Sequence, residues 1–167
     1  MIPGGAGQGG PVAMGKGGPS RAPRPIFGTD MTDLNIAAPL AAALAEKGYE
    51  SLTPVQLAVI APELEGRDAL VSAQTGSGKT VAFGLAMAPE VLGGDEILKP
   101  AEAPLALIIA PTRELAQQVA RELEWLYAKA GAQIATCVGG MDYRTERRAL
   151  SFGAHIVVGT PGRLRDH

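Results

Sequence analysis

The apolar residues of this chain follow helical spacing in some segments and form short continuous runs in others. In residues 34–47 they recur at near-helical spacing among many alanines, at Leu34, Ile36, Leu40 and Leu44. Gly48 follows this segment directly, and glycine commonly ends a helix. The pattern predicts a first helix over residues 34–47.

A second helix is predicted to begin at Thr53 and Pro54 and to run to about Leu64. Threonine is a favourable N-cap, and proline suits the first helical position because its missing amide hydrogen is not needed there. Gln56 stands three residues after Thr53, where its side chain can complete a capping box.

The remaining apolar runs alternate with helical patterns. Residues 68–74 read as a buried strand, followed by a glycine-rich loop and a helix over residues 79–91. The same order recurs downstream, with strands at residues 105–110, 133–138 and 155–158 and helices at residues 113–130 and 143–150. Such alternation predicts an α/β fold in which a parallel sheet carries helices on both faces.

The helix predicted over residues 113–130 carries one apolar stripe, formed by Leu115, Val119, Leu123 and Leu126. Trp125 and Tyr127 fit as packing or surface residues of this helix. No cofactor-binding role is needed to explain them.

The first 30 residues differ in composition from the rest, since they hold 9 of the 22 glycines and 5 of the 13 prolines. Such a segment buries too little apolar area to offset the entropy of ordering it. We expect residues 1–30 to be a disordered tail and residues 31–167 to belong to one domain. A basic tail that contacts RNA, a linker, and translated sequence upstream of a start at Met31 are all compatible with this composition.

Charge is distributed unevenly around a net value of -2. Residues 31–111 carry four basic and ten acidic side chains, whereas residues 112–167 carry eight and six. A polyanion would meet the least repulsion in the last third, although solvated arginine-rich helix faces explain the same counts.

Cys137 is the single cysteine, and His155 and His167 stand at no spacing typical of zinc ligands. No apolar stretch approaches the roughly 20 residues that span a bilayer. These features predict a reducing, cytoplasmic location and no membrane partner.

Residues 73–80, Ala-Gln-Thr-Gly-Ser-Gly-Lys-Thr, fit a phosphate-binding loop except for alanine at the first position. Gly76 and Gly78 let the main chain turn so that several amides converge on one polyphosphate. Lys79 offers a cation to the outer phosphates, and the Thr80 hydroxyl suits magnesium. The helix that follows directs the positive end of its dipole toward the same anion. A glycine-rich turn matched by chance is the alternative, and the predicted strand and helix on either side argue against it.

The sequence supports two interpretations of Gln56 about equally. Its position completes the capping box with Thr53, which needs no ligand. A glutamine amide can also donate to and accept from adenine at N6 and N7, which would select ATP over GTP.

Three short elements follow predicted strands, and ligands gather at the carboxyl ends of strands in open parallel sheets. They contain Pro111, Thr112 and Arg113 in the first, Gly139 and Gly140 in the second, and Thr160, Pro161, Gly162 and Arg163 in the third. Thr160-Pro161 is a helix start, and a helix N-terminus near an arginine suits a nucleic-acid phosphate. Each element alone is better explained as a strand-to-helix turn, and it is their combination that favours a binding role.

In order and spacing, these segments resemble successive motifs of DEAD-box RNA helicases over about residues 31–167. The segments are residues 48–56, 73–80, 111–116, 139–140 and 160–164. The resemblance implies a RecA-like fold and an ATP-dependent RNA helicase, with ATP and Mg²⁺ as cofactors and RNA as partner.

The resemblance also implies roles for individual residues. It assigns Tyr49, Thr53 and Gln56 to the adenine-recognising Q motif. It implies that Lys79 and Thr80 are the catalytic pair. The residues that it implies bind the ATP phosphates and magnesium are Gln74, Thr75, Gly76, Ser77, Gly78, Lys79 and Thr80. The three later elements would grip an RNA strand.

Two positions depart from the family pattern. Leu52 stands where many members carry proline, and Met31 stands where an isolated aromatic residue usually packs against adenine. A methionine thioether can still contact a flat base, and Phe27 lies four residues earlier. We expect weaker adenine packing.

The chain ends before the Asp-Glu-Ala-Asp strand and the second domain that the resemblance implies. We therefore expect a RecA-like parallel sheet truncated before its last strands, with an uncovered sheet edge and negligible ATP hydrolysis by the chain alone. A non-hydrolysing ATP- or RNA-binding module from a truncated gene is the alternative. A DNA helicase of the same fold and a kinase-like P-loop protein explain fewer of the five segments.

Overall fold

The computed structural model describes residues 34–167. The predicted tail at residues 1–30 lies outside this range, as do Phe27 and Met31. In chain order the elements are α1 (Ala38–Glu46), α2 (Pro54–Val59), η2 (Pro62–Leu64), α3 (Lys79–Ala86), α4 (Ala88–Leu92), β1 (Ala106–Ile109), α5 (Arg113–Leu126), η3 (Ala128–Ala130), β2 (Ile134–Cys137), α6 (Tyr143–Ser151), β3 (Ile156–Gly159) and α7 (Pro161–Asp166). None of the helices in residues 34–167 combines the length and apolar character that a membrane span requires.

The three strands form one parallel sheet in the order β1-β3-β2. The central strand β3 pairs on both sides, so that Ile109 of β1 and Cys137 of β2 both stand opposite Gly159. All three strands therefore end at the same edge, which we call the carboxyl edge. The predicted parallel α/β sheet is confirmed, with strand bounds within about two residues of those expected.

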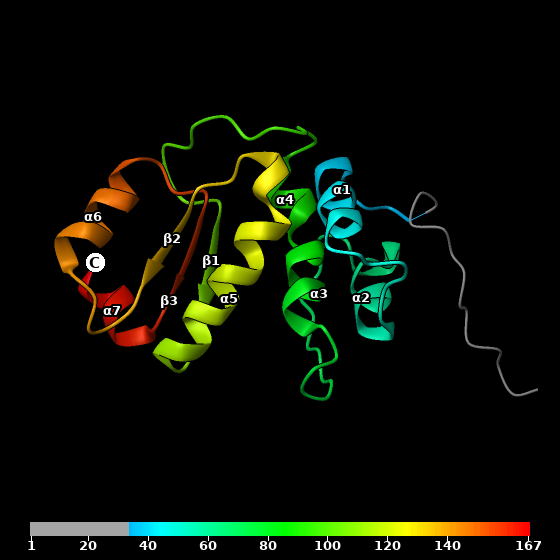
Figure 1. The fold of residues 1–167 in the computed structure, drawn as a ribbon, viewed down its shortest axis with the longest axis horizontal. Helices are drawn as coiled ribbons and strands as arrows, with labels where there is room; N and C mark the ends of the chain where they lie inside the picture. Colours follow the sequence, from blue (N-terminus) through cyan, green and yellow to red (C-terminus); the bar gives the residue numbers. More distant parts are fainter. Residues whose placement is uncertain (1–33) are drawn as a thin grey trace, which may run out of the picture.

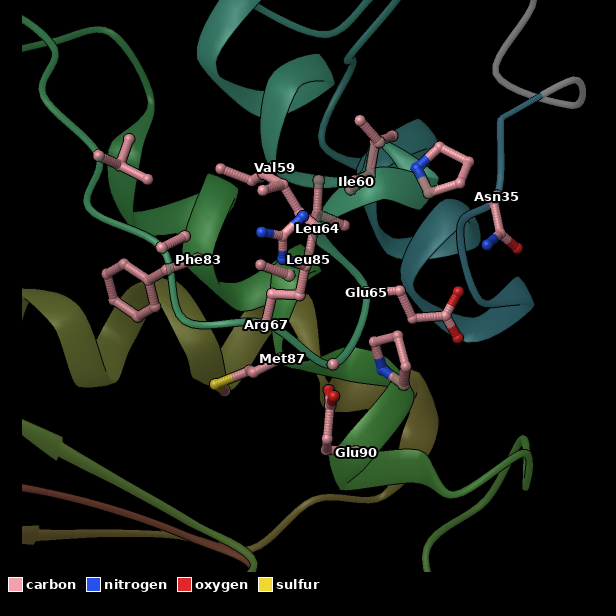
Figure 2. Close-up of a pocket in the computed structure, with 17 residues that line it drawn as sticks. Asn35, Val59, Ile60, Leu64, Glu65, Arg67, Phe83, Leu85, Met87 and Glu90 are labelled. Carbon is pink, nitrogen blue, oxygen red and sulfur yellow. The ribbon is translucent and has the colours of Figure 1, made fainter.

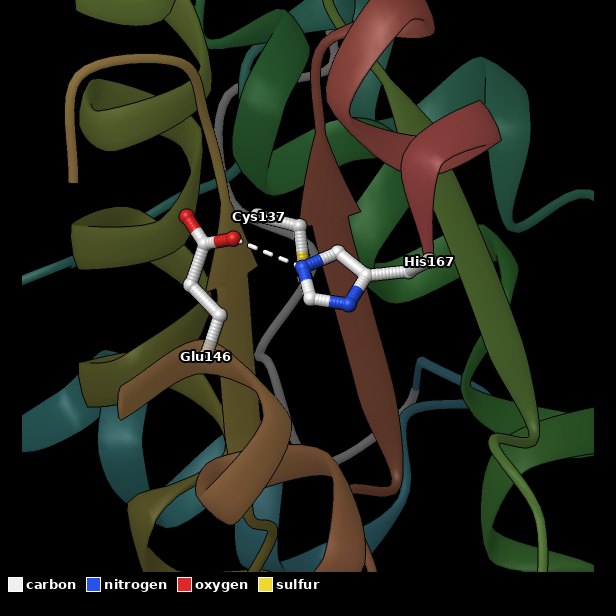
Figure 3. A group of neighbouring side chains, drawn as sticks. All are labelled: Cys137, Glu146 and His167. Atoms are coloured by element: carbon white, nitrogen blue, oxygen red, sulfur yellow. Dashed lines mark hydrogen bonds and ion pairs between the residues drawn. The ribbon is translucent and has the colours of Figure 1, made fainter. Parts of the chain in front are cut away.

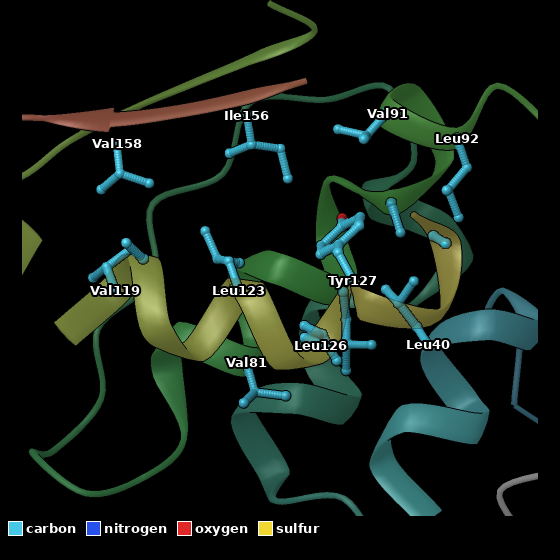
Figure 4. Packing of buried hydrophobic residues seen from close by; sticks show 14 of the residues in the cluster. Leu40, Val81, Val91, Leu92, Val119, Leu123, Leu126, Tyr127, Ile156 and Val158 are labelled. Carbon is cyan, nitrogen blue, oxygen red and sulfur yellow. The ribbon is translucent and has the colours of Figure 1, made fainter. Parts of the chain in front are cut away.

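Helix α5 covers one face of the sheet and forms the centre of the molecule (Figure 1). Val119 and Leu123 of this helix pack beneath Ile156 and Val158 of β3 in the main core (Figure 4). On its other side α5 contacts α3 and α1. The core thus runs from the sheet through α5 to the N-terminal helices.

Helices α6 and α7 cover the opposite face of the sheet (Figure 1). Leu150 and Leu164 of these helices pack against a small buried cluster around Cys137 and Val157. The prediction of helices on both faces is therefore confirmed.

The apolar stripe of α5 differs slightly from the predicted one. Val119, Leu123 and Leu126 are buried, but Leu115 is 40% exposed and Ala116 takes the buried position instead. Leu115 lies at the flank of the stripe in the first turn of the helix, so its side chain points away from the core.

Helix α2 begins at Thr53 and Gln56 as predicted, with a complete capping box. Thr53 Oγ1 accepts from the Gln56 amide at 3.4 Å, and Gln56 Oε1 accepts from the Thr53 amide at 2.9 Å. The helix ends at Val59, earlier than predicted. Pro62 lacks an amide hydrogen and holds Ala61 in an extended conformation, which interrupts the helix.

The single helix predicted over residues 79–91 is two helices, α3 and α4, which meet at Met87. Pro89 in the first turn of α4 has no amide hydrogen to donate to the carbonyl of Leu85, four residues earlier. The proline therefore divides the apolar pattern that the sequence presents as continuous.

Residues 68–74 form no strand, contrary to the prediction. Leu70 is fully exposed, and none of these residues pairs with the three-stranded sheet. Ala69 and Val71 instead line a cavity of about 370 Å³ together with Val59 and Phe83 (Figure 2). An apolar run becomes a strand only when a neighbouring strand satisfies its backbone groups, and no described strand lies beside this one.

Strand β1 is an edge strand with one covered and one open face. Ala106 and Ile108 pack against the core, whereas Leu107 and Ile109 are 60% and 61% exposed. This confirms the predicted uncovered apolar surface at a sheet edge.

Candidate functional site

The phosphate loop, residues 73–80, connects the exposed segment to helix α3. Gly76 and Gly78 have φ values of +80° and +82°, in the left-handed region that glycine adopts without strain. A Cβ atom on Gly78 would also collide with the Gln56 side-chain amide, which is buried and bonded to the Gly78 carbonyl. Both the backbone conformation and the space at Gly78 therefore require glycine.

The Lys79 side chain folds back over the phosphate loop. Its Nζ donates to the carbonyl oxygens of Ala73 at 2.5 Å and Gln74 at 2.6 Å. Ser77 Oγ donates to the same Gln74 oxygen at 2.6 Å. The loop is thus held by its own carbonyl groups, and an anion would compete with them for the Lys79 ammonium.

The start of α3 supplies further donors. Gly78 is its N-cap, and no side chain of the described residues caps the helix. The first amide hydrogens of α3 consequently lack helical partners and surround the positive end of the helix dipole. With the Lys79 ammonium and the Thr80 hydroxyl in the first turn, these groups fit a phosphate chain and its magnesium ion.

Helix α2 is attached directly to the phosphate loop. Thr53 Oγ1 donates to the Ser77 carbonyl at 2.9 Å, and Gln56 Nε2 donates to the Gly78 carbonyl at 3.3 Å. The Gln56 side chain is fully buried by these contacts. The capping-box interpretation of Gln56 is therefore confirmed, while adenine recognition stays a prediction that requires its amide to become accessible.

Tyr49 lies apart from these contacts. Its ring stacks on Trp125 of α5 with 6.0 Å between the ring centroids, and Lys47 lies 5.3 Å from the Trp125 ring centroid. Partial burial, followed by the charge of Glu122, raises the pKa of the Tyr49 hydroxyl. The structure thus assigns Tyr49 a packing contact, and its predicted adenine contact is untested.

The three elements predicted to follow strands all lie at the carboxyl edge. Residues 111–113 follow β1, residues 139–140 follow β2 and residues 160–163 follow β3. Because the three strands end in register, segments separated by up to about fifty residues in sequence become neighbours in space. Their predicted location is therefore confirmed.

Two arginines converge on the loop after β2. Arg163 Nη2 donates to the Met141 carbonyl at 2.9 Å, and its Nε donates to the Val138 carbonyl at 3.4 Å. Arg113 approaches from α5 so closely that a Cβ on Gly140 would lie 2.5 Å from its Nη1. Gly140 has φ +82°, a left-handed turn that favours glycine.

The two threonines of this edge begin their helices differently. Thr112 Oγ1 accepts from the Leu115 amide at 3.2 Å and so caps α5. Thr160 is the N-cap residue of α7 but makes no side-chain capping bond within the described residues. The Thr160 hydroxyl is therefore the freer of the two for an external group.

Glu146 is a site-forming residue that sequence reasoning missed. Its carboxylate is buried; Oε1 accepts from the Val138 amide at 3.0 Å, and Oε2 pairs with Arg163 Nε at 3.4 Å. A possible signal was its place on α6, between the exposed arginines Arg144 and Arg147 but on the side that faces the sheet. This contact orients Arg163 at the carboxyl edge.

Comparison with known proteins identifies relatives that match most of the chain. A family model for the DEAD/DEAH box helicase matches residues 53–167. The "ATP-dependent RNA helicase DeaD" of Escherichia coli (strain K12) is 46% identical over 142 residues, which are 84% of this chain and 22% of that protein. The "DEAD-box ATP-dependent RNA helicase 3B, chloroplastic" of Zea mays is 45% identical over 130 residues, which are 76% of this chain and 17% of that protein. The chain thus spans about a fifth of the length of these relatives.

Solved structures agree with the sequence relatives. A DEAD box protein from Methanococcus jannaschii aligns with a TM-score of 0.69 at 37% identity, covering 83% of this chain and 36% of its own. The yeast DEAD-box splicing factor Prp28 also aligns with a TM-score of 0.69, at 33% identity, covering 78% of this chain and 32% of its own. With the parallel sheet and its two helical faces, these likenesses confirm the RecA-like fold class.

Proposed function

Because this chain belongs to the DEAD/DEAH box helicase family, we propose that it binds ATP at the phosphate loop and RNA at the carboxyl edge. It would do so as part of an ATP-dependent RNA helicase that unwinds or remodels RNA. The observation that carries the proposal is the pairing of an uncapped, lysine-bearing helix start with an arginine-lined strand edge in one domain. The first suits a nucleotide and the second a nucleic-acid backbone.

Each residue of the phosphate loop has a distinct proposed role. Residues 74–78 present backbone amides to the phosphates. Lys79 exchanges its two loop carbonyls for phosphate oxygens, and Thr80 offers its hydroxyl to Mg²⁺, which neutralises phosphate charge when bound. Thr53 and Gln56 carry the base selection proposed for the Q motif, since they already contact Ser77 and Gly78.

At the carboxyl edge, the proposed ligand is the sugar-phosphate backbone of RNA. Arg113 and Arg163 supply charge, Gly139 and Gly140 allow close approach of a backbone, and the Thr160-Pro161 helix start supplies amide donors. Such contacts position a strand without reading its sequence. A reducing, cytoplasmic location is proposed with them, in keeping with a single buried thiol at Cys137.

The chain alone is proposed to bind nucleotide without appreciable turnover. Its 167 residues contain no Asp-Glu-Ala-Asp sequence and hence none of the carboxylates that would hold magnesium opposite Thr80. An RNA-stimulated ATPase rate comparable to that of a complete helicase would contradict this.

Titration with a fluorescent ADP tests the nucleotide site. We expect saturable binding that Lys79→Ala abolishes, that Gln56→Ala weakens and that GDP displaces poorly. Lys99→Ala removes an exposed lysine outside the phosphate loop and is the matched control that should bind normally. Unchanged binding by Lys79→Ala, with Lys99→Ala as reference, would refute the proposed site.

Fluorescence anisotropy with single-stranded RNA tests the carboxyl edge. Arg113→Ala should weaken binding for all RNA sequences and reduce the salt-dependence slope by about one. Arg121→Ala removes an exposed arginine of the same helix, away from the carboxyl edge, and should have a smaller effect. Equal losses in both variants would indicate non-specific charge attraction instead of a defined edge.

A further inference from the structure

The sheet face covered by α6 and α7 brings together three side chains with metal-binding atoms. They are Cys137 at the end of β2, Glu146 on α6 and His167 after α7, and their ligand atoms lie within 4.8 Å of one another (Figure 3). The spacing of these residues in the sequence gives no zinc pattern. The fold alone assembles the cluster, because β2, α6 and α7 meet at this point.

We propose that Cys137, Glu146 and His167 form a binding site for a zinc-class divalent cation, with water as the fourth ligand. Thiolate sulfur, imidazole nitrogen and carboxylate oxygen are the three atom types that bind zinc in proteins. Softer sulfur and nitrogen ligands also disfavour magnesium and calcium, which take oxygen ligands.

The distances require only small movements of the ligands. Zinc lies about 2.3 Å from sulfur and about 2.0–2.2 Å from nitrogen or oxygen, so paired ligand atoms are separated by roughly 3.3–3.6 Å around a tetrahedral ion. His167 Nε2 and Glu146 Oε2 are now 2.7 Å apart and must separate slightly, and all three ligand atoms lie within 4.8 Å of one another. His167 follows the last helical turn, where its side chain can make this adjustment.

Two of the three ligands are already oriented by neighbouring groups. The Val138 amide donates to Glu146 Oε1 at 3.0 Å and leaves Oε2 directed toward His167. The Tyr143 ring stacks on the His167 ring, with 4.5 Å between centroids and 7° between planes. Metal sites use such outer contacts to fix the orientation of their ligands.

A Cys137 thiolate and the Glu146 carboxylate together carry the two negative charges that neutralise a 2+ ion. Arg163, at 3.4 Å, balances Glu146 in the metal-free structure, and a bound cation would take its place as the partner of that carboxylate. Burial, followed by the Glu146 charge, raises the pKa of the Cys137 thiol to about 11, so the metal-free thiol is protonated. Binding forms a metal–sulfur bond and releases that proton to solvent, and the His167 imidazole must be neutral with its proton on Nδ1.

Titration of the 167-residue chain with Co²⁺ tests the site, because cobalt(II) replaces zinc and its absorption reports sulfur ligation and geometry. We expect one Co²⁺ per chain, a thiolate-to-cobalt charge-transfer band, tetrahedral d–d bands, and loss of these bands on adding Zn²⁺. Cys137→Ser should abolish the charge-transfer band. Absence of that band in the unmodified chain would overturn the proposal.

Two conservative variants guard against effects on folding. Glu146→Gln keeps an oxygen acceptor for the Val138 amide, and His167→Asn alters a residue outside the helices. Each should weaken Co²⁺ binding by about tenfold or more with unchanged circular dichroism. Asp166→Asn, which changes the neighbouring carboxylate outside the cluster, is the matched control that should bind normally. Wild-type affinity in His167→Asn would also overturn the proposal.

Discussion

The N-terminal helical region, residues 34–92, and the sheet region, residues 105–167, respond differently to similar sequence patterns. Both contain short apolar runs that predict strands. In the sheet region every such run is a paired strand, whereas residues 68–74 in the helical region stay exposed and unpaired. The contrast teaches that a helix closes its own hydrogen bonds, while a strand depends on what lies beside it.

The two proposed binding surfaces show the same contrast. The lysine of the phosphate loop makes local contacts, to carbonyls five and six residues away, although Thr53 and Gln56 also attach the loop to α2. The carboxyl edge is held by contacts over long sequence separations, as Arg163 bonds to Val138 and Met141. We therefore expect the phosphate loop to rearrange readily on binding a ligand and the carboxyl edge to be largely pre-formed.

The largest expected loss of stability comes from a substitution in α5, the helix that joins the two regions. Leu123 is fully buried between the sheet and α3, so Leu123→Ala should lower the free energy of unfolding by about 2–5 kcal/mol. Urea unfolding followed by circular dichroism and by Trp125 fluorescence measures it. If the two regions form one cooperative unit, both signals shift together; separate transitions would show that the sheet region unfolds independently.

The second largest expected loss of stability comes from removing one hydrogen bond between α5 and the N-terminal helical region. The Tyr127 hydroxyl donates to the Gly84 carbonyl of α3 at 2.7 Å, and its side chain is fully buried. Tyr127→Phe removes this bond while keeping the ring, so we expect a loss of about 0.5–1.5 kcal/mol in unfolding free energy. A chemical-denaturation midpoint equal to that of the unmodified chain would mean that this bond does not couple α5 to the helical region.

The two threonines of the carboxyl edge give a matched pair with a smaller effect. Thr112→Ala removes the cap of α5 and should cost about 1 kcal/mol, whereas Thr160→Ala removes no capping bond and should cost less. If the free Thr160 hydroxyl contacts the RNA backbone, Thr160→Ala should weaken RNA binding more than Thr112→Ala does. Thermal melts and RNA anisotropy on both variants separate stability from binding, and equal melting temperatures would contradict the capping assignment.

The smallest expected effect on stability is at the open face of β1. Ile109→Thr changes a side chain that is 61% exposed and should alter the unfolding free energy by no more than about 0.5 kcal/mol. Ile108→Thr, one residue away on the covered face, should cost clearly more. Light scattering should show less self-association for Ile109→Thr, and a gain in self-association would argue against the exposed face as its cause.

Much of the molecule was predictable from local sequence signals. Thr53 with Gln56, Thr112 and Thr160 mark helix starts, and Gly76 and Gly78 mark the phosphate loop, because caps and left-handed turns depend on residues a few positions apart. The spacing of apolar residues and the alternation of strands and helices along the chain also predicted the parallel sheet and the placement of three motifs at its carboxyl edge.

Tertiary structure decided whatever depends on partners far away in sequence. It left residues 68–74 without a neighbouring strand, turned Gln56 inward against Gly78, and placed Glu146 beside Cys137, Arg163 and His167. None of these outcomes follows from spacing along the chain. Each is set by which backbone and side-chain groups the packed helices and sheet leave within hydrogen-bonding distance, and that depends on the whole fold at once.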